Sequence, residues 1–288
     1  MHHKFTSSYP FGHYCKFLII TLIVVSCGIS NANAGAWPVR PGKVLLSLTG
    51  TYFNADQKWD ENGRKQQYDD NGYFRSLSMY LYGEFGASRV VTIVTSIPYV
   101  SNTFTNSGLK STVSGLGDAE IGGRIYITNI KFKFYLAVQG TIVVPLYTNT
   151  ADKNLGYQAF GTDVKIIGSG SGKLSASKSF YYTVELGGRQ YSSSTGPQQL
   201  RGTASFGINL DPKNQLAFSG NGVYSHSDYK QFDNNLAANK DFSYVQASIS
   251  AGHTFTKDFS VFVGYNQFVA GRNTGIGSNF SLSFINKF

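Results

Sequence analysis

Apolar and polar residues alternate along most of the chain from residue 43 onward. In the stretch 73–85, for example, Leu77, Met79 and Leu81 occupy every second position. Successive side chains of a β-strand point to opposite faces, so this alternation predicts strands with one apolar and one polar face. The pattern predicts about twelve strands, at residues 43–53, 73–85, 90–100, 118–128, 131–144, 161–168, 180–190, 201–210, 215–225, 242–255, 259–268 and 277–288.

The predicted connections alternate between short turns and long polar loops. Short turns follow the second, fourth, eighth and tenth strands, and long loops follow the first, third, fifth, seventh and ninth. Transmembrane barrels have this asymmetry, with short periplasmic turns and longer extracellular loops. An even number of strands then places both chain termini on the periplasmic side. The linker 169–179, after the sixth strand, is longer than this scheme expects.

The charged residues of the predicted strands fall on the face opposite the apolar residues. Ala119, Ile121 and Ile125, for example, alternate with charged positions of the same strand. An Arg or Lys that faces lipid at the middle of a bilayer costs roughly 2–4 kcal/mol, so we expect the charged side chains to face the lumen. The predicted pore-lining residues are Glu84, Asp118, Glu120, Arg124, Lys133, Asp163, Lys165, Glu185, Arg189 and Arg201.

A soluble sandwich of two sheets would also explain the alternation and the turns. Its interior, however, would have to bury these charged side chains, which is costly. We therefore predict an all-β fold, a transmembrane antiparallel β-barrel of about twelve strands with both termini periplasmic.

The amino-terminal residues predict export. Lys4 and Lys16 precede the apolar run 17–25, and Ala32-Asn33-Ala34 is the small-x-small pattern of a signal-peptidase site. A membrane-spanning helix would need about 20 apolar residues. Cys27 leaves a lipoprotein cleavage site open as an alternative. We predict a signal peptide at 1–34, a barrel domain at 35–288 and a location in the outer membrane of a Gram-negative cell.

The carboxyl terminus predicts how the barrel closes. Phe284 and Phe288 lie on alternate positions of the last predicted strand, which must pair with the first to close the wall. This ending resembles the signal that the barrel-assembly machinery recognises in outer-membrane proteins. Asn286 departs from that signal, because an apolar or aromatic residue is more usual there. We expect Phe284 and Phe288 to act as the assembly signal.

Composition and charge narrow the chemistry. Both cysteines, Cys15 and Cys27, lie in the predicted signal peptide, which excludes disulfides and thiol chemistry from 35–288. Removing the signal peptide takes two lysines from the net charge of +9 and leaves +7. Export argues against nucleic acid as a partner. We expect outer-membrane lipids, lipopolysaccharide and anionic or other small solutes as partners, and no cofactor.

Catalytic and metal-binding interpretations are weak. Ser225, His226 and Asp228 combine the residue types of a hydrolase, but neighbouring residues of a strand point to opposite sides and do not form a triad. The His-x-Ser-Asn-Gly type segment of barrel phospholipases is absent. No His, Asp or Glu cluster has metal-ligand spacing, and the segment 60–63 is better explained as a solvated turn than as a calcium loop. We predict that the protein is not an enzyme.

Two segments carry a resemblance to a known family. Residues 115–126 (GLGDAEIGGRIY) resemble the GxGD segment, followed by a basic-x-Tyr strand, of the outer-membrane family labelled for the MetA pathway of phenol degradation. The segment 35–43 is similar to the XagA-like members of that group. The resemblance implies an outer-membrane channel that takes up small, including aromatic or hydrophobic, molecules.

Two functions therefore stay open. The first is a porin-like channel, whose charged residues line a narrow pore. The second is a non-conducting surface or structural protein, whose charges cross-link the lumen and whose long loops bind partners or lipopolysaccharide. Barrels of about eight strands are filled by side chains and those of about sixteen hold water channels, so a count near twelve allows both.

Overall fold

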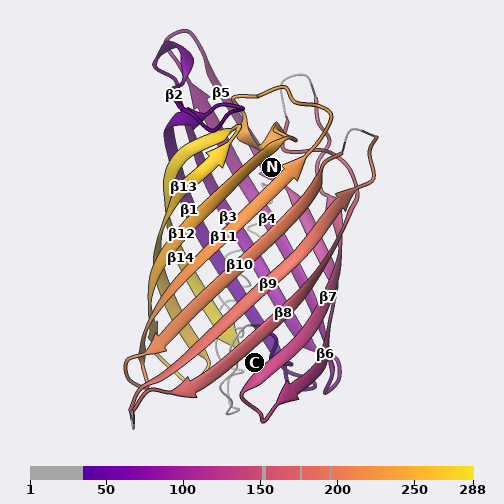
Figure 1. The fold of residues 1–288 in the computed structure, drawn as a ribbon, viewed down its shortest axis with the longest axis vertical. Helices are drawn as coiled ribbons and strands as arrows, with labels where there is room; N and C mark the ends of the chain where they lie inside the picture. The colour runs from indigo at the N-terminus through magenta and orange to yellow at the C-terminus, as the bar shows by residue number, and fades with distance from the viewer. Residues whose placement is uncertain (1–34, 151–153, 176, 195) are drawn as a thin grey trace, which may run out of the picture.

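The strands form one closed antiparallel β-barrel, shown in Figure 1. The structure is a computed structural model that describes residues 35–288 apart from 151–153, 176 and 195. The predicted signal peptide lies outside the described residues. The wall has twelve strand positions, and β14 pairs with β1 to close it. The prediction of a twelve-stranded antiparallel barrel is confirmed.

The wall is built from long strands that pair in sequence order. Their bounds are β1 (Val44–Trp59), β3 (Tyr73–Gly86), β4 (Val91–Thr105), β6 (Asp118–Ile130), β7 (Phe134–Pro145), β8 (Gly161–Lys173), β9 (Ser179–Tyr191), β10 (Gln198–Asn209), β11 (Asn214–His226), β12 (Phe242–Thr254), β13 (Phe259–Arg272) and β14 (Thr274–Lys287). Two short strands, β2 (Lys65–Gln67) and β5 (Lys110–Leu116), extend the wall at the upper end in Figure 1. The loops of that end hold two short 3-10 helices, η1 (Asp69–Asn71) and η2 (Leu236–Ala238).

Two predicted connections are wrong. The predicted loop after the third strand is mostly strand. β4 pairs with β6 along its first part and with β5 along its last part, so β5 and β6 together occupy one position in the wall. The backbone N–H of Gly117 donates to the carbonyl oxygen of Pro98 where β5 gives way to β6. The predicted linker 169–179 is also mostly strand, because β8 runs on to Lys173 and leaves a short turn at 174–178.

The short turns and both ends of the barrel wall lie at one end of the molecule. The pairing of β1 with β14 brings Val44 beside Phe288, and each backbone N–H donates to the other's carbonyl oxygen, at 3.3 and 2.8 Å. The short turns, at 87–90, 131–133, 174–178, 210–213 and 255–258, lie at the same end of the strands. We call this the turn end and the opposite one the loop end. The periplasmic location of the turn end stays a prediction.

The outer face of the barrel is apolar. Large side chains such as Leu48, Leu77, Ile121, Leu186 and Phe280 are exposed on strands spread around the wall. All backbone groups of a closed barrel pair between strands, which makes this fold stable in a bilayer. No helix in the described part of the chain is long and apolar enough to cross a membrane.

The segment before β1 lies inside the barrel rather than outside it. Ala36 is fully buried and packs with Ala137 of β7 and Ile167 of β8. A Cβ atom at Gly86 would overlap the carbonyl oxygen of Arg40, so a glycine is needed at the end of β3, where this segment passes close to it. We call residues 35–40 the lumen segment.

Candidate functional site

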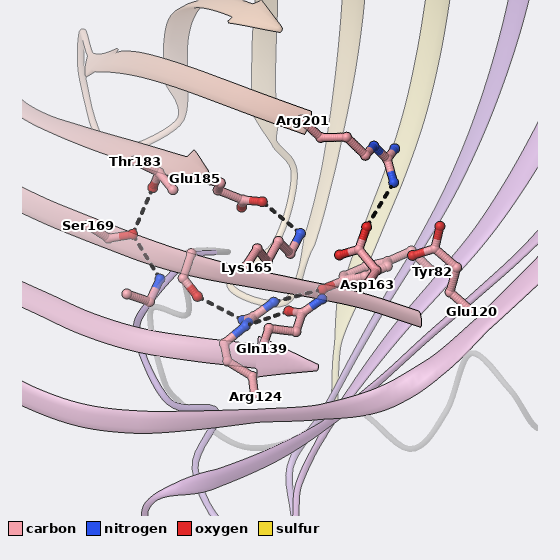
Figure 2. A network of polar contacts seen from close by, with 12 residues as sticks. Tyr82, Glu120, Arg124, Gln139, Asp163, Lys165, Ser169, Thr183, Glu185 and Arg201 are labelled. Carbon is pink, nitrogen blue, oxygen red and sulfur yellow. Dashed lines mark hydrogen bonds and ion pairs between the residues drawn. The ribbon is translucent and has the colours of Figure 1, made fainter. Parts of the chain in front are cut away.

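Most of the predicted charged residues collect on one side of the lumen. They come from five strands, β3, β6, β8, β9 and β10, within the part of the wall that runs from β3 to β10. Nine of the ten predicted residues belong to this set, and Figure 2 shows most of them together. Lys133 does not: β7 begins at Phe134, so Lys133 lies exposed in the turn 131–133. Its predicted place in the lumen is wrong because the alternating pattern was continued through the turn.

Arg124 is the centre of the first group of contacts. Its guanidinium lies 3.0 Å from Oε1 of Glu84, and both side chains are buried. It also donates to Oε1 of Gln139 at 3.0 Å and to the hydroxyl of Tyr82 at 3.0 Å. The Tyr82 hydroxyl in turn donates to Glu84 at 2.6 Å. A buried charge is tolerated only when it is paired and hydrogen-bonded, and this group meets that condition.

Arg189 is the centre of the second group. Its Nε lies 3.0 Å from Oδ2 of Asp163, and its Nη2 pairs with Glu120. Asp163 also pairs with Arg201 at 3.2 Å. These contacts join β6, β8, β9 and β10 across the inside of the wall.

Lys165 and Glu185 form a separate pair that is open to the lumen. Nζ of Lys165 lies 2.7 Å from Oε2 of Glu185, and about a quarter of each side chain is exposed. Because water reaches and screens both side chains, the pair contributes less to stability than a fully buried one would. The pair is therefore better placed to meet a solute than to hold the wall together.

The lumen segment is bound to the charged side of the wall. The carbonyl oxygen of Gly35 accepts a hydrogen bond of 2.7 Å from Arg124, and the N–H of Ala36 donates to Oγ of Ser169 at 2.8 Å. The N–H of Val39 donates to Oγ1 of Thr92 at 3.3 Å. Arg124 thus binds side chains of the wall and the backbone of the lumen segment at the same time. The segment narrows the lumen at the turn end.

A cavity of about 590 Å³ remains beside the lumen segment. Gly35, Glu84, Arg124, Lys165 and Glu185 line one side of it. The opposite side carries small hydroxyl side chains of β1 and β10–β14: Ser47, Ser205, Ser219, Ser248, Ser250, Ser260, Ser281 and Ser283. The lumen is therefore not filled by side chains at this level. Charged side chains thus line one side of the cavity, and small hydroxyl groups line the other.

A second cavity of about 390 Å³ lies toward the loop end. Its lining is aromatic, with Phe53, Phe74, Tyr80, Tyr244 and Phe268 among its residues. Asp118 also lines it, as the predicted pore-lining role expects. Two differently lined spaces thus follow each other along the barrel.

The loop 227–241 covers the loop end of the second cavity. Leu236 packs against the buried cluster of Phe74, Tyr68 and Phe104. The amide of Asn235 donates to the carbonyl oxygen of Asn154 at 2.6 Å. These contacts reach across the mouth of the barrel to other wall strands and to the loop 146–160.

Asp241 fixes the end of that loop. It pairs with Arg272 at 2.6 Å, and Nδ1 of His226 lies 3.6 Å away. Burial alone would raise the pKa of the Asp241 carboxyl, but the hydrogen bond and charge of Arg272, with the N–H of Ser227 and the nearby His226, hold the pKa below its usual range. The carboxylate is therefore ionised at neutral pH and anchors the loop.

Sequence reasoning missed two parts of the lumen. The serines have the same inward parity as the charges, as Ser281 and Ser283 show between Phe280, Leu282 and Phe284. That parity could have identified them. The lumen segment has no such signal, because its place depends on contacts with distant strands.

The residue types of a hydrolase are kept apart in the structure. Oγ of Ser225 donates to the carbonyl oxygen of Lys240 at 2.6 Å, while the neighbouring His226 is exposed and lies beside Asp241. Within the described residues, no group of three or more His, Cys, Asp or Glu side chains is placed to hold a metal ion.

Solved structures with a similar fold are outer-membrane barrels. The COG4313 outer membrane channel from Pseudomonas putida F1 has a TM-score of 0.66 at 14% identity, covering 90% of this chain and 100% of that one. The beta domain of the Bordetella autotransporter BrkA has a TM-score of 0.51 at 11% identity, covering 86% of this chain and 100% of that one. Comparison with curated proteins finds no match.

These likenesses show the fold, and the family model shows the relationship. The closed barrel and its apolar outer face give the outer membrane as the location. The family model described as "Putative MetA-pathway of phenol degradation" matches residues 43–284, which is most of the chain. It is the family that the segment 115–126 resembles. The chain belongs to this family of the putative MetA pathway of phenol degradation.

Proposed function

We propose that the protein is an outer-membrane channel for small solutes, without catalytic activity. The observation that supports this most is the cavity of about 590 Å³ between the charged side and the serine side of the lumen. A barrel that served only as a scaffold could fill this space with side chains. Fixed charges and hydroxyl groups around an open space are the lining of a selective pore.

The lumen is narrowed at both ends, which suggests a restricted channel rather than a wide porin. The lumen segment reduces the width of the lumen at the turn end, and the loop 227–241 covers the lumen at the loop end. Between them, a solute would meet the aromatic lining near Phe53 and Tyr244 and then the charged lining near Lys165 and Glu185. The proposal thus favours small molecules that carry both an apolar part and a polar group, in line with the aromatic or hydrophobic solutes that the family resemblance implies.

Osmotic swelling of proteoliposomes tests this proposal. Vesicles with the folded protein should take up small solutes faster than protein-free vesicles, with a steep decline as solute size increases. Swelling no faster than that of protein-free vesicles would support the second candidate, a non-conducting surface protein whose ion pairs cross-link the lumen.

We also propose, from position alone, that Phe284 and Phe288 act as the assembly signal. Phe284 is exposed on the lipid face, and Phe288 is the last residue to pair with β1.

A further inference from the structure

The short turns of the turn end share a chemical pattern. Every one of the five carries at least one exposed basic residue, on the turn or next to it. These residues are Arg89, Lys131, Lys133, Lys173, Lys178, Lys213 and Lys257. In the described part of the chain, none of the seven forms an ion pair. We call these five turns with their flanking residues the turn ring.

Every turn of the ring also exposes one large apolar side chain. These are Val90, Phe132, Leu174, Leu210 and Phe255. Isolated exposed apolar residues are common on protein surfaces. One such residue beside a cation in each of five turns, at the same end of a membrane barrel, is a repeated arrangement rather than an isolated case.

Phe132 is the most pronounced example. It is 80% exposed, and both it and Lys131 have left-handed backbone conformations, with φ of 55° and 51°. A turn with two successive residues at positive φ favours Asn-Gly there, because bulky side chains are disfavoured at positive φ. The turn is held by the side chain of Asn129, whose Oδ1 accepts a hydrogen bond from the N–H of Phe132 at 3.1 Å. An unfavourable conformation that exposes an aromatic ring suggests that the ring has a partner.

The ring is strongly positive overall. Its only acidic residues are Asp211 and Asp258. The Asp211 carboxylate is occupied within its own turn, where it accepts hydrogen bonds from the backbone of Lys213 and the side chain of Asn214. By contrast, the loop 227–241 at the loop end carries three acidic residues and two lysines.

Cations beside apolar tips suit the boundary of a membrane with negatively charged headgroups. Apolar side chains enter the region between headgroups and acyl chains, while Lys and Arg contact lipid phosphates. The exposed ring of Phe132, between Lys131 and Lys133, has this form in three consecutive residues. Soluble acidic partners would explain the cations but not an apolar tip on every turn.

We propose that the turn ring binds the phosphate groups of anionic phospholipids in the leaflet that surrounds the turn end, with Phe132 and the other apolar tips inserted among the lipids. The proposal rests on the outer-membrane location and does not depend on channel activity. With the turn end in the periplasm, the partner is a phospholipid such as phosphatidylglycerol rather than lipopolysaccharide.

Native mass spectrometry of the folded protein with added lipid tests the proposal. Wild-type protein should retain phosphatidylglycerol in preference to phosphatidylcholine. The variant with Lys131→Gln, Lys133→Gln, Lys173→Gln and Lys178→Gln should lose this preference, by roughly fivefold for each lysine that contacts a phosphate. The matched control replaces Arg64, Lys65, Lys110 and Lys230 of the loop end with Gln, which removes the same charge, and should keep the preference.

Three outcomes would overturn the proposal. They are an unchanged preference in the turn-ring variant, an equal loss in both variants, and a turn-ring effect confined to lipopolysaccharide. Slower gel migration on boiling confirms that each variant is folded.

A second measurement does not depend on removing charge. Tryptophan introduced as Phe132→Trp should be quenched by phospholipids with brominated acyl chains, above the background of Trp37 and Trp59. Tyr229→Trp, at an exposed position of the loop 227–241, is the control and should be quenched less. A Phe132→Trp signal with water-like emission and no added quenching would contradict insertion of the turn.

Discussion

Arg189 shows how the lumen keeps charges inside a membrane protein. Its guanidinium contacts Asp163 and Glu120 from neighbouring strands, and it is 7% exposed. Lys165 and Glu185 make a comparable ion pair but are about a quarter exposed. The same chemistry therefore has two roles, one in holding the wall and one in facing the open lumen.

Replacing Arg189 tests this difference. Arg189→Gln removes the partner of Glu120 and one of the two partners of the buried Asp163, and breaking a buried pair costs about 3–5 kcal/mol. Lys165→Gln should cost less than about 1 kcal/mol, because its pair is solvated. Thermal unfolding in detergent measures both. Equal destabilisation by the two variants would show that burial does not separate the two roles.

Among the elements, the loop 227–241 has the most specific attachment. Asp241 holds it through Arg272, the N–H of Ser227 and the nearby His226. Because these contacts lower the pKa of Asp241 in the folded protein, they contribute stability above the usual pKa of an Asp, about 3.9. That contribution is lost as pH falls through the lower folded pKa.

Hydrogen exchange of the loop should follow this anchor. At neutral pH, Asp241→Asn should speed exchange in 227–241 by roughly tenfold, since a hydrogen bond to a charged group contributes about 1.5 kcal/mol. In the wild type, the exchange rate of the loop is first corrected for the intrinsic pH dependence of exchange. The corrected rate, which reports how often the loop opens, should increase only below about pH 4. Asp228→Asn removes a neighbouring exposed acid and should change neither. A loop that opens equally in both variants would exclude Asp241 as the anchor.

The strands of the wall could be predicted from the sequence, but some of their ends could not. All twelve wall positions were predicted, because lipid on one side and a polar lumen on the other impose strict alternation. β5 was missed, since Lys110–Leu116 extends beyond the main wall and lacks an alternating apolar face. The end of β8 was missed for a related reason: its residues 168–172 are Gly and Ser only. The alternating pattern shows which face of a strand a charged residue lies on. It does not show the register between strands, which decides which charged residues pair.

The barrel as a whole has three chemically different surfaces. The outer face is apolar, the lumen has a charged side and a serine side, and the turn end is cationic. The lumen segment and the loop 227–241 narrow the two ends without filling the cavity between them. These features together favour restricted passage of small solutes over a closed scaffold.

Single-channel recording in planar bilayers, with wild-type protein and Lys165→Gln, shows whether the barrel conducts ions. The account predicts discrete current steps of small size for the wild type. Lys165→Gln should conduct as well, with a reversal potential shifted toward cations, because it removes a fixed positive charge from the cavity lining. A correctly folded, membrane-inserted wild-type barrel that never conducts would contradict the assignment as a channel.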